Sequence, residues 1–408
     1  MRFGGQTTLS IRALIVVATI FGVSACQQGT LTLPDLSGQQ TKRPPVNPPP
    51  AKPKRIVTPA FNGQKVGNGP IRLALLLPIS ASGGAGQVGK ELANAAKLAV
   101  RDFGAGRLQV IIKDTKGQAA EASILAAQAR DEGASLVLGP LFSANVSSAS
   151  AVTLPANIPM IGFSSDIARA RRGVYLLSFA PDADIRRTLN YGLSLGANKV
   201  VALLPDTSYG RLAEQELRRT YDRGSGQVVS VVRYARNSNA MVTAARSVAL
   251  ALSNANAIYI PDGGQAPSLL LNSLKQGGVS LSGLQIMGSG QWESVNKNDP
   301  VLNGAIYAGA DKRNFSRYAT RYQATYGNTP TATSALAYDA ISLSAELIRR
   351  NNLDPFNAAA IQSQSGFSGA SGIFRFSNNG RLQRGLVVNK IEQGRVTIVS
   401  PAPTSFRR

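Results

Sequence analysis

The sequence predicts an α/β protein whose folded part consists of two Rossmann-like lobes. Apolar runs of strand length alternate with segments of helical spacing from residue 71 onward, and the alternation occurs in two series separated near residue 199. The 408 residues are 43% hydrophobic, which is enough apolar material for two ordinary cores. Alternation of this kind is typical of parallel sheets covered by helices.

The first series opens with an apolar run at residues 71–77, interrupted only by Arg72, which ends at Pro78. Such a run predicts a strand that is buried on both faces. Helical spacing follows at residues 89–103. The remaining elements of this series are expected as strands at 108–112, 135–138 and 160–162 and helices at 119–130 and 144–153.

The second series has the same organisation. Its expected elements are strands at 200–204, 228–233, 257–260 and 284–287 and helices at 210–221, 241–252 and 267–276. A strand at 305–308 and helices at 314–326 and 333–349 follow. The terminal stretch, residues 372–399, contains the turn signals Asn378-Asn379-Gly380 and Glu392-Gln393-Gly394, which predict hairpins.

The amino terminus reads as a processing signal over residues 1–25. Arg2 and Arg12 precede or border an apolar stretch at 13–23, which is too short to span a bilayer, and small residues precede Cys26. Val23-Ser24-Ala25-Cys26 resembles the bacterial lipobox, which implies a lipidated Cys26 that anchors the chain to a membrane. Because Gln27 follows in place of aspartate, the outer membrane is the expected destination. The alternative is an ordinary signal peptide that happens to precede a cysteine.

Residues 26–70 are polar and rich in proline, so this segment predicts an extended, semi-rigid tether behind the lipidated cysteine. Its basic residues are Lys42, Arg43, Lys52, Lys54 and Arg55, which either contact anionic head groups or are simply solvated.

Two absences restrict the chemistry. The chain has no histidine and one cysteine, which excludes Ser-His-Asp and Cys-His catalysis and makes a zinc site improbable. The run from Gly83 to Gly86 does not match a nucleotide-binding motif. The net charge of +22 indicates either a face that binds anionic partners or arginines that are simply solvated at the surface. Because the amino terminus predicts export from the cytoplasm, we do not expect nucleic acid as the partner. We therefore expect a binding protein without metal or cofactor, and not an enzyme.

Ligands of open parallel sheets bind beyond the carboxyl ends of the strands. The loops expected there are rich in glycine and serine, which either bind a polar ligand or serve as ordinary loop residues. Two facing lobes would bring these loops to one cleft for a small polar ligand. The candidate ligand-binding residues are Ser80, Ser82, Ser143, Asn145, Ser164, Ser165, Tyr209, Asp262 and Gln291.

Six motifs carry a resemblance that covers most of residues 71–399. They are Leu75-Leu76-Leu77-Pro78-Ile79-Ser80, Leu138-Gly139-Pro140, Ile158-Pro159-Met160-Ile161, Asp206-Thr207-Ser208-Tyr209-Gly210, Ala337-Tyr338-Asp339-Ala340 and Phe374-Arg375-Phe376 before Gly380. In this order the chain resembles the leucine/isoleucine/valine-binding family of type I periplasmic binding proteins. The resemblance implies a first lobe at 71–180 plus 289–355 and a second lobe at 181–288 plus 356–400. A hinge that the chain crosses several times would join them and let them close around a ligand.

The resemblance also implies roles for individual loops. The ligand carboxylate would bind at Ser143–Asn145 and Ser164–Asp166, and its ammonium would bind an acidic residue at a position that falls on Gly290 here. Asp166 places a negative charge where the carboxylate should lie. Asp262 or Glu293 would then have to replace the missing acid, and Tyr209 matches the family's aromatic residue.

The chain is also similar to outer-membrane lipoprotein activators of penicillin-binding proteins, which carry a module of this fold on a tether. Two hypotheses follow for a protein at the periplasmic face of the cell envelope. One is a receptor for an amino acid or amide-like solute that delivers it to an ABC permease. The other is an activator or scaffold that contacts a penicillin-binding protein during peptidoglycan synthesis.

Overall fold

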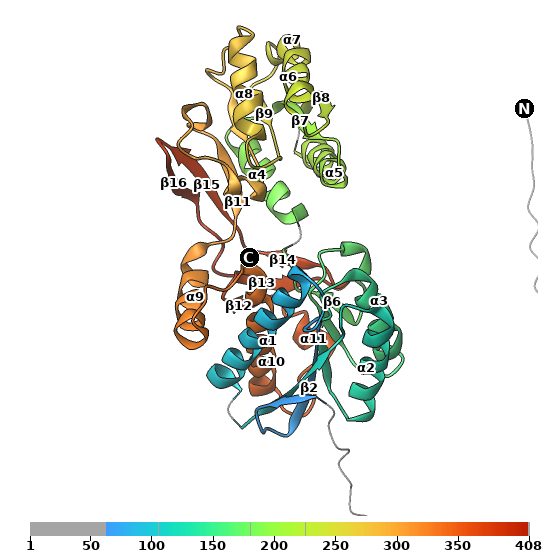
Figure 1. Cartoon of the computed structure of the whole chain (residues 1–408). Coiled ribbons are helices and arrows are strands. Elements are labelled where there is room, and N and C mark those ends of the chain that lie inside the picture. Colours follow the sequence, from blue (N-terminus) through green and yellow to red (C-terminus); the bar gives the residue numbers. More distant parts are fainter. Residues whose placement is uncertain (1–62, 105, 180, 225, 407–408) are drawn as a thin grey trace, which may run out of the picture. The chain divides into compact units, whose positions relative to one another are not determined.

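The computed structural model describes residues 63–104, 106–179, 181–224 and 226–406 (Figure 1). The predicted signal, Cys26 and nearly all of the predicted tether lie outside these residues. Within the described part of the chain, no helix combines the length and the apolar character that crossing a membrane requires.

The first sheet has six strands in the order β1-β3-β2-β4-β5-β6. Strand β1 is antiparallel to β3, and the other neighbours are parallel. Gln64–Val66 therefore forms an edge strand, although the sequence analysis placed it in the tether, because its backbone pairs with β3. The bounds are β1 Gln64–Val66, β2 Ile71–Leu77, β3 Leu108–Asp114, β4 Leu136–Leu138, β5 Met160–Gly162 and β6 Val174–Leu176.

Alternate residues of β2 point to opposite faces of this sheet, and both faces are covered. Leu73, Leu75 and Leu77 pack in one core with α1 Gly84–Phe103. Ala74 and Leu76 pack in the other core with helices α2 and α3. These two helices are Ala119–Asp131 and Ser143–Thr153. Burial on both faces is what the apolar residues 73–77 of β2 predict.

The second sheet has seven strands in the order β16-β15-β11-β10-β9-β7-β8. Helices α4 and α5 pack on one face, and α6, α7 and α8 pack on the other. The strands are β7 Lys199–Pro205, β8 Gln227–Tyr234, β9 Ala257–Tyr259, β10 Gln285–Met287, β11 Ile306–Gly309, β15 Val387–Glu392 and β16 Arg395–Ser400. The helices are α4 Pro181–Ser194, α5 Ser208–Arg223, α6 Ser238–Ser247, α7 Ala249–Leu252 and α8 Ala266–Gln276.

The segment between β11 and β15 packs with the first sheet. Its side chains share a core with β2 and α1, and Phe376 lies against Tyr175 with ring centroids 5.4 Å apart. Its elements are α9 Lys312–Tyr326, α10 Ala335–Arg350, α11 Ala358–Ile361, β12 Phe367–Gly369, β13 Gly372–Phe376 and β14 Leu382–Arg384, and the three strands form a small antiparallel sheet. Short 3₁₀ turns occur at η1 Ile167–Arg169, η2 Gly290–Ser294, η3 Pro300–Leu302 and η4 Ala332–Ser334.

The two lobes are confirmed, but their segments differ from the expected ones. Strand β11 was expected in the first lobe at 289–355, yet it pairs with β10 and β15 and so belongs to the second sheet. Strands β12 to β14 were expected in the second lobe at 356–400, yet they pack in the first core. The chain therefore changes lobe between β6 and α4, between β11 and α9, and between β14 and β15. These three crossings form the hinge.

Both expected hairpins are present, as β13–β14 and β15–β16. Neither β6 nor α4 was expected from the sequence. Strand β6 is only three residues long and so gives a weak pattern. Helix α4 begins at Pro181, and proline is a favoured first helical residue. This omission matters because α4 contributes to the cavity described below.

Candidate functional site

Four polar residues at the carboxyl ends of β4 and β5 bind one another. The hydroxyl of Ser143 donates to Oδ2 of Asp166 at 2.5 Å, and Nε of Arg169 donates to the same oxygen at 3.0 Å. The backbone N–H of Asp166 donates to Oγ of Ser164. The Ser143 bond, followed by the Arg169 bond, lowers the pKa of Asp166, so the carboxylate is charged at neutral pH. We call these four residues the first-lobe cluster. Their polar groups already have partners without a ligand.

No hydrogen bond among the described residues joins the other first-lobe candidates to this cluster. The backbone N–H of Ser80 donates to Oδ1 of Asp114 at 3.2 Å. Asn145 is buried, and its Nδ2 has no hydrogen-bond partner among the described residues. Ser82 and Ser165 are exposed loop residues.

A second polar cluster lies at the carboxyl ends of β7, β8, β9 and β10. Tyr209 donates to Oγ of Ser289 at 2.6 Å, and Asp262 accepts from Tyr234 at 3.1 Å and from Arg236 at 2.7 Å. Burial raises the pKa of Tyr209, so it remains a neutral donor. We call these five residues the second-lobe cluster. Asp262 already has a cation, so it is a poor replacement for the missing ammonium ligand.

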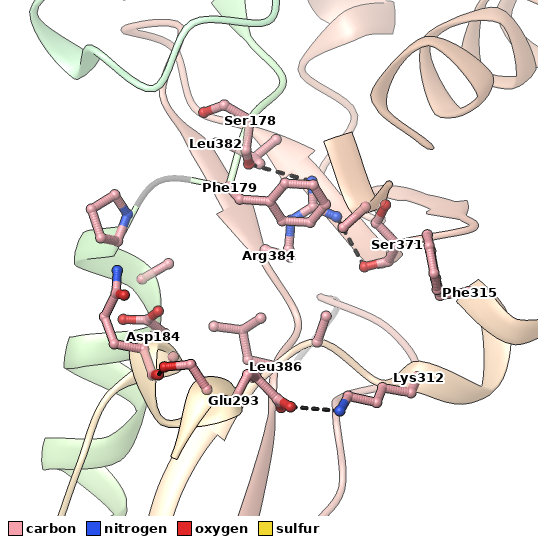
Figure 2. A pocket seen from close by; sticks show the side chains of 18 of the residues that line it. Ser178, Phe179, Asp184, Glu293, Lys312, Phe315, Ser371, Leu382, Arg384 and Leu386 are labelled. Atoms are coloured by element: carbon pink, nitrogen blue, oxygen red, sulfur yellow. Dashed lines mark hydrogen bonds and ion pairs between the residues drawn. The ribbon is translucent and has the colours of Figure 1, made fainter. Parts of the chain in front are cut away.

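A cavity of about 610 Å³ lies against the hinge, and all three crossings contribute to its wall (Figure 2). We call it the hinge cavity. Of the nine candidate ligand residues, only Gln291 lines it, with Gly290 and Glu293 as neighbours. The lining residues are Ser178, Phe179, Pro181, Ala183, Asp184, Gly290, Gln291, Glu293, Ser294, Gly309, Ala310, Lys312, Phe315, Ser316, Ala332, Ser371, Leu382, Arg384 and Leu386.

Asp184 supplies an acid next to the position where Gly290 lacks one. It lies in the first turn of α4 and lines the hinge cavity. A methyl carbon placed on Gly290 would lie 2.1 Å from Oδ2 of Asp184, so this carboxylate fills the space of the missing side chain. Oδ1 has no hydrogen-bond partner among the described residues. Burial raises the pKa of Asp184 to about 7, although the backbone amides of Ile185 and Gly290 oppose the rise.

The other carboxylate in the wall is paired. Glu293 forms an ion pair with Lys312, whose side chain is largely exposed, and Figure 2 shows the contact at the edge of the cavity. From the sequence, Asp262 or Glu293 was expected to replace the missing acid. Asp184 fits this role better than Glu293, because Asp184 lies beside Gly290 whereas Glu293 is paired with Lys312.

Arg384 of β14 is a half-buried base that lines the same cavity. Its Nη1 donates to the carbonyl of Ser371 at 2.9 Å and its Nη2 to the carbonyl of Ser178 at 3.4 Å. The guanidinium lies 4.7 Å from the ring centroid of Phe179. Burial lowers the pKa of Arg384 to about 10, which still leaves it charged at neutral pH.

The sequence analysis missed Asp184, Arg384, Phe179 and Phe315. One signal for the first was available, because Pro181 followed by Asp182 and Asp184 is typical of a helix start. Arg384 has the appearance of a surface charge in a hairpin strand, and no local pattern distinguishes it from its neighbours.

With this geometry established, the family can be assigned. A family model described as periplasmic binding protein matches residues 70–395, which is most of the chain. The chain belongs to this family. Membership implies a binding protein outside the cytoplasm and agrees with the expected resemblance. A search of curated proteins found no match.

Solved structures show the same fold. A branched-chain amino acid ABC transporter protein from Rhodospirillum rubrum is 19% identical, with a TM-score of 0.69, and the match covers 81% of this chain and 99% of that chain. A branched-chain amino acid ABC transporter periplasmic ligand-binding protein from Burkholderia xenovorans is 19% identical, with a TM-score of 0.60 and coverage of 81% and 95%. An ABC transporter substrate-binding protein from Desulfitobacterium hafniense, in complex with Leu, is 18% identical, with a TM-score of 0.56 and coverage of 81% and 99%. At these identities the likeness establishes the fold and not the ligand.

Proposed function

We propose that this protein is an extracytoplasmic receptor for a small solute that carries an ammonium group, such as an amino acid or a related amide. The solute binds in the hinge cavity, with its ammonium against Asp184. One observation carries the proposal: Asp184 has an oxygen without a partner, and its carboxylate occupies the space that Gly290 leaves open.

The electrostatics of Asp184 support this assignment. A carboxylate that loses water without gaining a cation is destabilised in its charged form, and the raised pKa expresses this cost. An ammonium would restore a favourable partner and lower the pKa again. Apolar side chains of Phe179, Phe315, Leu382 and Leu386 line the cavity, and a less polar surrounding strengthens the attraction between two opposite charges.

Thermal unfolding tests the proposal. The purified full chain should gain stability with at least one of the twenty amino acids in the millimolar range, because a ligand that binds only the folded state stabilises it. Asp184→Asn should abolish this gain, and Asp222→Asn, an exposed change at the end of α5, is the matched control. A gain that is equal in Asp184→Asn and the unmodified chain would reject the cavity as the site.

We further propose that lipids on Cys26 anchor the receptor to the outer membrane and that an ABC permease receives its solute. The only cysteine of the chain follows an apolar stretch and two small residues, which supports lipidation. Cys26→Ser should move the protein from the membrane fraction to the soluble periplasmic fraction, and mass spectrometry of the mature amino terminus should lose the lipid mass.

A second candidate is an activator of a penicillin-binding protein. The first-lobe cluster favours the activator. The family resemblance assigns the hydroxyl of Ser143 to a ligand carboxylate, but here this hydroxyl donates its hydrogen bond to Asp166. A protein with this subsite filled by its own side chain need not transport amino acids. Retention of a penicillin-binding protein on immobilised full chain, with no thermal shift for any amino acid, would support the activator and reject the receptor.

A further inference from the structure

Arg384 is a half-buried cation that forms no ion pair with a carboxylate of the described residues, although Asp339 stabilises its charge from a longer distance. Its hydrogen bonds to two neutral carbonyls use two of the five N–H donors of a guanidinium. Its Nε has no partner among the described residues. Asp339 acts on it only at a distance, since the carboxylate of Asp339 accepts the backbone amides of Ala370 and Ser371.

An unpaired buried charge is costly, and an anion beside it reduces that cost. Arg384 lines the hinge cavity beside Ser371, whose carbonyl accepts one of its hydrogen bonds. Lys312 adds a positive charge at the rim, although Glu293 neutralises it. Among the described residues, the cavity therefore presents one base without an ion-pair partner, Arg384, and one acid without an ion-pair partner, Asp184.

The acid and the base do not neutralise each other. They form no ion pair, and Figure 2 shows them apart in the wall, with no bond drawn between them. They also come from different lobes, because Asp184 lies on α4 of the second lobe and Arg384 on β14, which packs with the first. Apolar side chains make up much of the wall around them.

Resting on the proposed receptor function, we propose that Arg384 binds the carboxylate of the solute, so that the hinge cavity selects zwitterions whose two charges are separated by apolar carbon. Such a ligand gives each buried charge its counter-ion. It also links the lobes at the hinge, so it favours whichever arrangement of the lobes lets both contacts form at once.

Four probes of matched carbon skeleton or charge test this proposal by titration calorimetry on the full chain. They are 6-aminohexanoate with both charges apart, hexylamine with the cation alone, hexanoate with the anion alone, and leucine with both charges on one carbon. We expect 6-aminohexanoate to bind at least tenfold more tightly than each of the other three.

The variant Arg384→Gln separates the two contacts. It should lower the affinity for 6-aminohexanoate to that for hexylamine and leave hexylamine binding unchanged. Arg381→Gln is the matched control, because Arg381 is exposed in the same hairpin and does not line the cavity. This control should bind all four probes as the unmodified chain does.

The outcomes distinguish this proposal from the receptor proposal. If hexylamine and 6-aminohexanoate bind equally to the unmodified chain, and Asp184→Asn weakens both, Arg384 has no ligand role and the receptor proposal stands. If leucine binds more tightly than 6-aminohexanoate, charge separation is rejected. If no probe and no amino acid binds, both proposals fail. The first comparison needs no variant, so it holds even if Arg384→Gln does not fold.

Discussion

The first-lobe cluster and the hinge cavity place ionised side chains in opposite situations. In the cluster, Asp166 binds Ser143 and Arg169, and its side chain and that of Arg169 are 38% and 40% exposed. In the cavity, Asp184 and Arg384 each retain a buried polar atom without a hydrogen-bond partner among the described residues. A satisfied network gains little from a ligand, whereas an unsatisfied one gains a counter-ion. We therefore expect the ligand to bind in the hinge cavity and not at the loops of the first-lobe cluster.

The same comparison explains a difference in titration. Partners lower the pKa of Asp166, and burial without a cation raises the pKa of Asp184. At neutral pH the carboxyl group of Asp166 is therefore ionised, whereas that of Asp184 is partly protonated. The four predictions below test whether the contrast is real, beginning with the largest expected effect.

The largest effect should come from Gly290→Ala, because the new methyl group would overlap Oδ2 of Asp184. Overpacking of this kind costs about 1–3 kcal/mol of unfolding free energy, measured by urea denaturation. The double variant Gly290→Ala/Asp184→Ala should recover most of the loss, since the overlapping carboxylate is gone. Gly84→Ala, where a methyl group meets nothing, is the control and should lose no stability. Additive losses in the double variant would show that Asp184 does not fill the space at Gly290.

Asp184→Asn should change how stability depends on pH. The folded pKa of Asp184 is about 7, against an ordinary 3.8, so its contribution is complete below pH 3.8 and is lost as the pH rises through 7. Between pH 4.5 and pH 8 the melting temperature of the unmodified chain should fall relative to Asp184→Asn, by roughly 4 °C. Parallel pH profiles for the two proteins would contradict the buried, unpaired carboxylate. Asp339 titrates in the same direction in both proteins and cancels in this difference.

Periodicity predicted most of the fold, because each long strand and helix buries one repeating pattern. The apolar run of β2 and the turn at Asn379-Gly380 predicted elements that are present. The lobe boundaries were predicted less well, since pairing of β11 with β15 joins residues about 80 positions apart and leaves no local signal. The acid of the cavity was missed for a similar reason. Its importance depends on the absent side chain of Gly290, which only three-dimensional proximity reveals.

Tyr209→Phe tests the second-lobe cluster, which is more buried than that of the first lobe. Loss of the phenol removes the 2.6 Å bond to Ser289. We expect a loss of about 1 kcal/mol in unfolding free energy. Ser289 retains its own bond to the carbonyl of Pro261, which limits the damage. Tyr191→Phe is the control, because its hydroxyl makes one exposed contact at 3.5 Å and should cost less. An equal cost for both variants would mean that burial of this cluster adds nothing.

Asp166→Ala should have the smallest effect, although it removes the most connected residue of the first-lobe cluster. Exposed ion pairs contribute at most about 1 kcal/mol, and urea denaturation at pH 7 should show a loss within that limit. Because partners lower its folded pKa, the contribution of Asp166 is present above pH 3.8 and disappears as the pH falls through the folded pKa. The difference between variant and unmodified chain should therefore vanish in acid. Binding of 6-aminohexanoate should not change, since Asp166 does not line the hinge cavity. Loss of that binding would indicate that the solute contacts the first-lobe cluster, and that its site lies at the cleft loops and not in the hinge cavity.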